Sequence, residues 1–154
     1  MKLDEGASEV VHRGDAPVVS LRPGDPLPKL AKPLTEHEIM GRWVNNPGFP
    51  LVSILCITYN HENYIGDALN SFLNQETVFP FEIIVHDDAS SDRTAEIVES
   101  YVKKYPNIVK AFFQTENKYS QGHRPLKFMK NMCEGKYCAL CEGDDYWLKL
   151  SLPS

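Results

Sequence analysis

Leu51-Val-Ser-Ile-Leu-Cys-Ile-Thr-Tyr-Asn60 is the stretch that decides the fold class. Apart from Ser53, its first part is apolar and rich in β-branched side chains, which is typical of a strand buried on both faces. The polar end, Thr58 to Asn60, terminates the strand. Strands of this kind occur almost only in parallel sheets covered by helices, so the stretch predicts an α/β protein.

Strand and helix patterns alternate along the chain after this stretch. Further strands are predicted over 81–85, 108–113 and 136–141. Apolar residues at helical spacing predict a helix over 65–73, another that begins near Asp92 and ends before Pro106, and a third over 126–133. The alternation predicts a mostly parallel sheet with flanking helices and right-handed crossovers.

The N-terminal third of the chain has a different composition. Residues 1–34 contain five prolines and no sustained hydrophobic period, so we expect a mobile arm. Thr35 and Glu38 have capping-box spacing and predict a short helix over 35–43, within a helix-and-linker segment of 35–49. The α/β domain is expected over 50–147, followed by an atypical tail, 148–154.

Composition and charge narrow the function classes. The 154 residues suit one domain, and the net charge of −5 argues against nucleic-acid binding, which needs clustered Lys and Arg. No apolar run approaches about 20 residues, and no signal peptide is visible. The expected location is therefore cytoplasmic, and peripheral association with the inner face of the membrane through other parts is left open.

The cysteine pattern does not indicate a metal or redox site. The four cysteines are Cys56, Cys133, Cys138 and Cys141. Cys138-x-x-Cys141 resembles half of a zinc motif, but a second ligand pair is absent and a redox motif should open a helix. We expect reduced cysteines that pack as small apolar residues in and beside buried strands.

Polar residues directly follow three of the predicted strands. They are Tyr59-Asn60, Asp87-Asp88 and the segment 142–145. In an open parallel sheet, ligands bind outside the carboxyl ends of the strands. The sequence therefore predicts that these three groups converge on one edge of the sheet.

The acidic segment allows two interpretations. Glu142, Asp144 and Asp145 repel one another unless a cation lies between them, and hard oxygen ligands suit Mg²⁺ or Mn²⁺. A bound metal could neutralise charge on a leaving nucleotide. Alternatively, Gly143-Asp144-Asp145 is an exposed turn. Tyr146 and Trp147 argue against a fully solvated turn, because large aromatic side chains tend to be buried.

The other candidates also have structural alternatives. Asp87 and Asp88 could accept hydrogen bonds from a base or a ribose, or belong to a helix N-terminus, although Ser91 and Asp92 already supply a cap. Tyr59 could pack on a base or lie in the core. Arg124 and Lys127 could contact phosphate or be surface cations. His86 and His123 are expected to be loop or supporting residues.

Several motifs of other nucleotide-binding enzymes are absent. No G-x-G-x-x-G follows the first strand, and the chain has neither a G-x-x-x-x-G-K-[ST] loop nor a G-x-S-x-G elbow. These absences argue against a dinucleotide dehydrogenase, a P-loop NTPase and an α/β-hydrolase.

Three blocks in this order resemble glycosyltransferase family 2. They are Val52-Ser-Ile54 leading to Tyr59-Asn60, then Ile83-Ile-Val-His-Asp-Asp-Ala-Ser-Ser-Asp-Arg-Thr94, then Gly135-Lys-Tyr-Cys-Ala-Leu-Cys-Glu-Gly-Asp-Asp-Tyr-Trp147. The resemblance covers residues 50–147. It implies a GT-A fold, which is Rossmann-like, and assigns this chain to the N-terminal nucleotide-sugar-binding part, truncated after the D-x-D-type region.

The resemblance also implies roles for single residues. Tyr59 would lie beside the base, Asp88 would bind a ring N–H, and Asp87 would help to hold the ribose. In the D-x-D-type region, Asp145 would be the first metal contact, supported by Asp144, and Glu142 replaces the more usual first Asp. The expected donor-binding residues are Ile57, Tyr59, Asn60, Asp87, Asp88, Asn117, Arg124 and Asp144, with Asn117 to Arg124 running past the phosphates.

The implied activity is inverting transfer of a sugar from an Mn²⁺- or Mg²⁺-bound nucleotide-diphosphate sugar, expected to be a UDP-sugar. The acceptor would be a glycan or a lipid-linked glycan. The family's general base lies in an acceptor half, whose pattern the tail 148–154 does not continue, so no catalytic base is assigned. Alternatives are a nucleotidyltransferase, which would need an early Gly-rich loop, and a non-catalytic nucleotide-sugar-binding remnant or structural domain.

Overall fold

A parallel four-stranded sheet forms the centre of the chain, whose computed structural model describes residues 30–148. All three strand pairs are parallel, as the sequence predicts. The strand order is β3-β2-β1-β4, so the decisive stretch lies inside the sheet and not at its edge. The strands are β1 (Val52–Thr58), β2 (Phe81–Asp87), β3 (Val109–Phe113) and β4 (Tyr137–Glu142).

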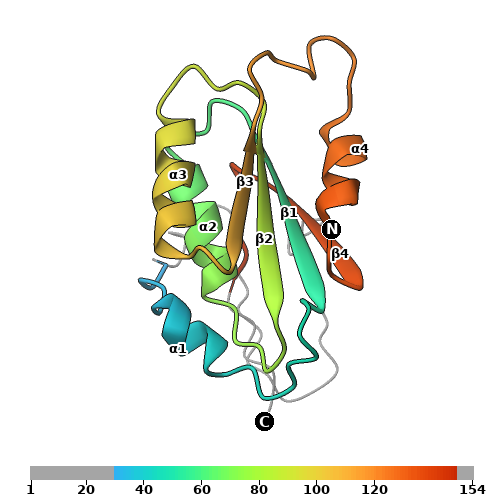
Figure 1. Cartoon of the computed structure of the whole chain (residues 1–154). Helices are drawn as coiled ribbons and strands as arrows, with labels where there is room; N and C mark the ends of the chain where they lie inside the picture. The colour runs from blue at the N-terminus through green and yellow to red at the C-terminus, as the bar shows by residue number, and fades with distance from the viewer. Residues whose placement is uncertain (1–29, 149–154) are drawn as a thin grey trace, which may run out of the picture.

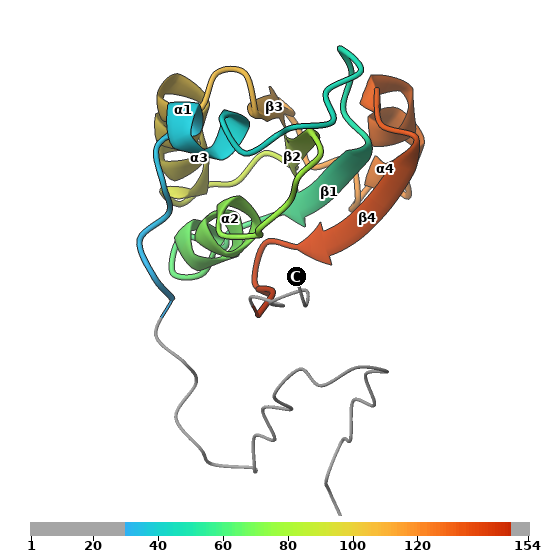
Figure 2. The same cartoon turned by 90° about the horizontal axis from the view of Figure 1, so that it is seen from below.

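Helices cover both faces of this sheet (Figures 1 and 2). α2 and α3 lie on one face and α4 lies on the other, which is the layered α/β arrangement expected. The last helix is shorter than predicted, because the backbone N–H groups of Glu134 and Gly135 turn toward Glu82 and Ser53. The helices are α1 (Glu36–Met40), α2 (Ile65–Leu73), α3 (Thr94–Lys104) and α4 (Pro125–Met129), the last followed by the 3₁₀ turn η1 (Lys130–Met132).

The larger part of the core lies between the sheet and the α2–α3 layer. The apolar face predicted for α2 is fully buried: Ile65, Leu69 and Phe72 are each 0% exposed. Burial of each such side chain stabilises the fold by about 1.5–3 kcal/mol. After β4 the chain returns over α2, where Trp147 packs edge-on against Phe72 with ring centroids 4.9 Å apart. Its backbone N–H also donates to Ser71 Oγ at 3.0 Å.

β4 differs from the prediction, because it is an edge strand and not a buried one. Tyr137 is 56% exposed and Leu140 is 52% exposed. Cys138 is also exposed, so the expectation of a core cysteine is wrong for this residue, whereas Cys56 and Cys141 are buried. On the α4 side of the sheet, Met129 packs against Leu55 of β1 and Ile84 of β2, and β4 pairs with β1 alone among the described strands, so the side chains of β4 on that face have less cover.

The capping box predicted for the first helix is present. Thr35 Oγ1 accepts the N–H of Glu38, and the Glu38 carboxylate accepts the N–H of Thr35. Two residues of the predicted arm contact the domain: Leu34 O accepts the Tyr105 hydroxyl, and Ala31 O accepts the Asn74 amide. The rest of the predicted arm, 1–29, and 149–154 of the tail lie outside the described residues. Within 30–148, no helix has the length and apolar character needed to cross a bilayer.

Candidate functional site

The carboxyl ends of three strands meet at one edge of the sheet. Thr58 pairs with Asp87 across β1 and β2, and Ile57 pairs with Glu142 across β1 and β4. The N–H of Asp88 donates to Thr58 O at 3.0 Å, and the N–H of Gly143 donates to Ile57 O at 2.8 Å. The loops after β2 and β4 therefore flank the end of β1, so the predicted polar groups lie at the same edge.

The loop after β1 is tied to the loop after β2 through Asn60. Asn60 has a left-handed backbone (φ 53°), and its Oδ1 accepts the N–H of Ser91 at 2.8 Å. Its own N–H donates to Ser90 Oγ at 2.9 Å. Asn60 therefore acts mainly on the backbone of this edge, while its neighbour Tyr59 is 45% exposed and available to a ligand.

Asp87 and Asp88 are each 2% exposed, and both have structural partners. The Asp87 carboxylate accepts the N–H of Ser90 at 3.0 Å and also its hydroxyl. The Asp88 carboxylate accepts the backbone N–H groups of Lys118 at 2.7 Å and Tyr119 at 2.9 Å. Both aspartates therefore have structural partners, although the sequence assigns the helix cap to Ser91 and Asp92. Asp88 fastens the loop after β3 to this edge.

Arg93, and not Ser91 or Asp92 as expected, occupies the N-cap position of α3 and makes no side-chain cap hydrogen bond; the first turn is bound instead by Asp92. Its carboxylate accepts both the N–H and the hydroxyl of Thr94, the first residue of the helix. Those hydrogen bonds hold the pKa of Asp92 below its ordinary value, against the opposing effect of desolvation. A helix N-terminus thus begins beside the two buried aspartates.

The loop after β3 rises at the top of Figure 1 and leads into α4. Asn117 forms a turn, in which its Oδ1 accepts the N–H of Ser120 at 2.7 Å. Arg124 occupies the N-cap position of α4, and both Arg124 and Lys127 are exposed. Neither cation is held in place by a hydrogen bond or ion pair to another described residue, so both side chains can move toward an anion.

The acidic turn after β4 is packed against the end of β1 at Gly143. A Cβ on this residue would lie 2.7 Å from Thr58 Oγ1 and 3.0 Å from His61 Nδ1, so only glycine fits. Asp145 N–H donates to Glu142 O at 3.1 Å and closes the turn. Asp144 Oδ2 lies 3.8 Å from His61 Nε2. The turn interpretation and the ligand interpretation are thus compatible here.

The acidic side chains partly fit a divalent cation. No three His, Cys, Asp or Glu residues in the described range 30–148 lie close enough to hold one by themselves. The side chains of Glu142 and Asp145 are exposed and make no hydrogen bond or ion pair to any described residue. Mg²⁺ commonly uses one or two carboxylates and completes its shell with phosphate oxygens and water, which this turn allows.

Sequence reasoning missed the supporting residues Thr58 and His61. Thr58 Oγ1 and His61 Nδ1 are 3.2 Å apart beneath the acidic turn. Only their position at the end of a strand, next to Tyr59 and Asn60, could have indicated them. His86, expected to be a supporting residue, is 0% exposed; its Nε2 lies 3.2 Å from the Gln114 amide, and burial lowers its pKa.

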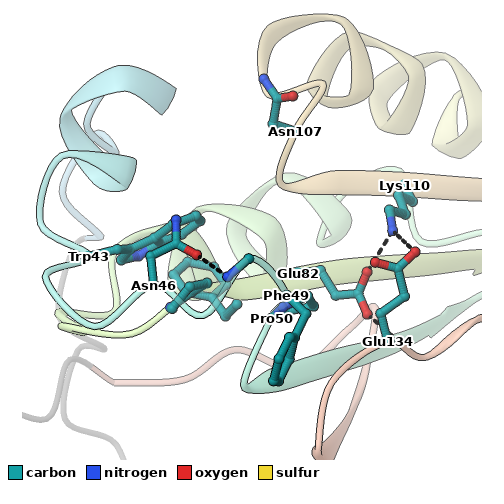
Figure 3. Close-up of a pocket in the computed structure, with 11 residues that line it drawn as sticks. Trp43, Asn46, Phe49, Pro50, Glu82, Asn107, Lys110 and Glu134 are labelled. Atoms are coloured by element: carbon teal, nitrogen blue, oxygen red, sulfur yellow. Dashed lines mark hydrogen bonds and ion pairs between the residues drawn. The ribbon is translucent and has the colours of Figure 1, made fainter.

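A separate hollow of about 240 Å³ lies at the opposite end of the sheet (Figure 3). Its walls include Trp43, Asn107 and the ion pairs that Lys110 makes with Glu82 at 2.8 Å and Glu134 at 3.1 Å. None of the predicted site residues lines it. The hollow can therefore serve as a negative control, because a ligand that binds at the carboxyl edge should not affect its residues.

Comparison with known proteins decides the family. Residues 53–154 match the family described as glycosyl transferase family 2. The chain belongs to glycosyl transferase family 2. A Mycobacterium tuberculosis protein is 44% identical over 103 residues, and the Staphylococcus aureus poly(ribitol-phosphate) β-N-acetylglucosaminyltransferase TarS is 36% identical over 103 residues. Each match covers 65% of this chain, and it covers 29% and 17% of those relatives.

Solved structures support the fold of this family 2 domain. S. aureus TarS 1–349 in complex with UDP-GlcNAc aligns with a TM-score of 0.53 at 34% identity, over 62% of this chain and 27% of that one. A Pyrobaculum calidifontis mannosyltransferase, solved with GDP-mannose and Mn²⁺, has a TM-score of 0.55 at 22% identity, over 70% of this chain and 33% of that one. The predicted GT-A, Rossmann-like fold is confirmed.

Proposed function

We propose that this domain binds the nucleotide part of a UDP-sugar at the carboxyl edge of the sheet, for an inverting glycosyltransferase. The observation that supports it most is the meeting of the Asp88 and Gly143 loops on either side of the end of β1. TarS, which is 34% identical over the aligned part, has been solved with UDP and with UDP-GlcNAc. Because the chain spans 15–38% of the length of its named glycosyltransferase relatives, the activity of the whole protein is part of the proposal.

The donor would contact one exposed and one buried side chain at this edge. Tyr59 is exposed and can pack against the base, with Ile57 and Asn60 shaping the same strand end. Asp88 would accept the ring N–H through its remaining lone pairs. Since Asp88 is 2% exposed, a base reaches it only when the loop holding Lys118 and Tyr119 moves.

Other groups on the same edge would hold the remaining parts of the donor. Asp87 lies beside Asp88 and would contact the ribose. Asn117 and Arg124 would follow the diphosphate, because the exposed guanidinium of Arg124 can pair with phosphate oxygens. The chain thus offers an acceptor for the base and a cation for the phosphates from two separate loops.

Asp145 and Asp144 would hold an Mn²⁺ or Mg²⁺ ion, with Glu142 at the start of the turn. When bound, the ion would neutralise negative charge on the leaving diphosphate. His61 is placed to orient Asp144, since its Nε2 lies 3.8 Å from that carboxylate. Packing of Gly143 against Thr58 fixes the height of the turn above the sheet.

Transfer itself needs a general base and an acceptor-binding surface. We propose a glycan or lipid-linked glycan acceptor, because TarS is named a poly(ribitol-phosphate) β-N-acetylglucosaminyltransferase and the Bacillus subtilis TuaG is named a putative teichuronic acid biosynthesis glycosyltransferase. No described residue is assigned as the base. The nucleotide-binding role can therefore be tested apart from turnover.

Calorimetry with UDP-GlcNAc, with and without Mn²⁺, tests the proposal. We expect binding that strengthens with Mn²⁺, and Asp145→Asn should lose that strengthening with no change in thermal unfolding. Glu99→Gln removes an exposed carboxylate on α3 and is the matched control, which should bind like the original chain. Equal affinity for Asp145→Asn and the control would refute the metal role.

A transfer assay then separates the two remaining interpretations. Donor hydrolysis or transfer would support a complete enzyme. Binding with no turnover would support a nucleotide-sugar-binding domain that needs a further part. A chain that binds neither UDP nor Mn²⁺ would refute the proposed function.

A further inference from the structure

Two cysteine side chains meet on the face of the sheet that α4 covers. Cys138 is the register partner of Ser53, so both side chains lie on the same face as Leu55, two residues along β1. Cys133 packs against the cluster that Leu55 forms with Met129 on that face. The Cys133 thiol makes side-chain hydrogen bonds with the Cys138 thiol and with the Ser53 hydroxyl. The two sulfurs therefore lie next to each other beside Ser53.

The turn between the two cysteines is held tightly against β1. The N–H of Gly135 donates to Ser53 Oγ at 2.9 Å, and a Cβ on Gly135 would lie 2.5 Å from Ser53 N. The N–H of Glu134 donates to the buried Glu82 carboxylate at 2.8 Å. These contacts fix the short segment that joins the cysteines, so the folded backbone itself holds their thiols near each other.

The other two cysteines lie on the opposite face of the sheet. Residues three apart on a strand point to opposite faces, so Cys141 does not approach Cys138 despite the C-x-x-C spacing. Cys141 is instead the register partner of Cys56, and both are buried in the core beneath α2 and α3. An oxidant in water does not reach that core, so this buried pair is an internal control for the first one.

The thiols of Cys133 and Cys138 differ in reactivity. Cys138 is exposed, whereas Cys133 is half-buried. Burial, and then the hydrogen bond with Cys138, raise the pKa of Cys133 to about 11, so its thiol stays protonated near neutral pH. Because the thiolate is the nucleophile in disulfide exchange, Cys138 would react first. The charge of Cys138 also raises the pKa of Cys133, and this effect ends once the Cys138 sulfur is bonded to another sulfur.

We propose that Cys133 and Cys138 are a dithiol site that a small disulfide, such as oxidised glutathione, converts into an intramolecular disulfide. The Cys138 thiolate attacks one sulfur of the oxidant, which forms a mixed disulfide and releases one thiolate. That thiolate takes the proton of Cys133, whose sulfur then displaces the second thiolate from Cys138. The protein pair loses two electrons, and one small disulfide becomes two thiols. The inference is independent of the proposed nucleotide site.

Mass spectrometry of the full chain after incubation with glutathione buffers and alkylation tests the proposal. Trypsin cuts after Lys130 and Lys136, so the bond would join the peptides 131–136 and 137–149. We expect this linked pair in the original chain, and its release by a dithiol reductant. Cys141→Ser removes the other cysteine of the second peptide and should form the same link. Absence of the linked pair overturns the proposal, and so does a link that Cys141→Ser abolishes.

Two single substitutions test the order of attack. Cys133→Ser should leave Cys138 as a mixed disulfide with glutathione, because no second thiol displaces the glutathione. Cys138→Ser should leave Cys133 reduced, because its half-buried thiol stays protonated. The reverse pattern overturns the assigned order.

Concentrated urea separates the folded contact from mere proximity in the sequence. If the fold holds the thiols together, the ratio of linked to free pair at one glutathione ratio should be at least about tenfold higher in the folded chain than in urea. Equal ratios would mean that the short spacing in the sequence alone forms the link, and would overturn the inference from the structure.

Discussion

Substitution of Gly143 by alanine is the sharpest perturbation of the candidate site. The added methyl would lie 2.7 Å from Thr58 Oγ1 and 2.8 Å from Thr58 Cβ, closer than real Cβ contacts. Thr58 is 1% exposed and lies at the end of β1, so it has little room to yield. Overpacking of this kind costs about 1–3 kcal/mol. The acidic turn must also rise, which moves Asp144 and Asp145.

Gly66→Ala is the matched control, because it adds the same methyl in the first turn of α2. The nearest atom to its Cβ would be the Tyr101 hydroxyl at 3.8 Å, an ordinary contact. Replacing this glycine with alanine should stabilise the domain by about 0.4–1 kcal/mol, because alanine restricts the unfolded chain more than glycine does. The two variants should thus change the free energy of unfolding in opposite directions.

Urea unfolding followed by circular dichroism measures both changes, and titration with UDP and Mn²⁺ measures the effect on the site. We expect Gly143→Ala to lose both stability and metal-dependent nucleotide binding, and Gly66→Ala to keep the binding. If Gly143→Ala unfolds at the same urea concentration as the original chain, the steric argument is wrong. If it is destabilised but binds normally, the turn does not position the ligand.

Three further changes have defined outcomes. Lowering the pH from 7 to 5.5 should reduce the free energy of unfolding less in His86→Gln than in the original chain. Burial depresses the pKa of folded His86, so the unfolded state takes up more protons in this window. This uptake lowers the free energy of unfolding of the original chain by at most about 1.4 kcal/mol per pH unit. Urea unfolding at both pH values measures it, and an unchanged difference contradicts it. Glu82→Gln should lower the free energy of unfolding by about 1–3 kcal/mol, because this buried carboxylate accepts the Glu134 N–H and the Lys110 ammonium. A decrease of less than about 0.5 kcal/mol would contradict this prediction. Asp88→Asn turns one acceptor into a donor facing the N–H groups of the 118–119 loop, so hydrogen exchange there should accelerate, and unchanged exchange would contradict the anchoring role.

The sheet and its helices follow from local patterns in the sequence. The apolar run before Thr58 and the helical face of α2 were predictable, because their burial depends mainly on their own periodicity. The exposure of β4 was not predictable, since its composition resembles that of β1. Whether such a strand is buried depends on which elements pack over its faces, and its own periodicity does not show this.

The candidate site was predictable as a place but not in its internal contacts. Topology alone brings the residues after the strands to one edge. The hydrogen bonds that the N–H groups of Lys118 and Tyr119 donate to Asp88 join residues 30 and 31 positions apart, and no local sequence pattern indicates such pairs. The same holds for Gly143, whose close approach to Thr58 depends on the register of β1 and β4.

An NMR titration with UDP and Mg²⁺ tests the central claim that one edge of the sheet binds the donor. We expect amide shifts at Tyr59, Asp88, Lys118 and Asp145 together, and no shift of the Trp43 indole N–H, which lies at the hollow on the opposite end. Shifts confined to the surroundings of Trp43, or shifts in only one of the three loops, would contradict the account.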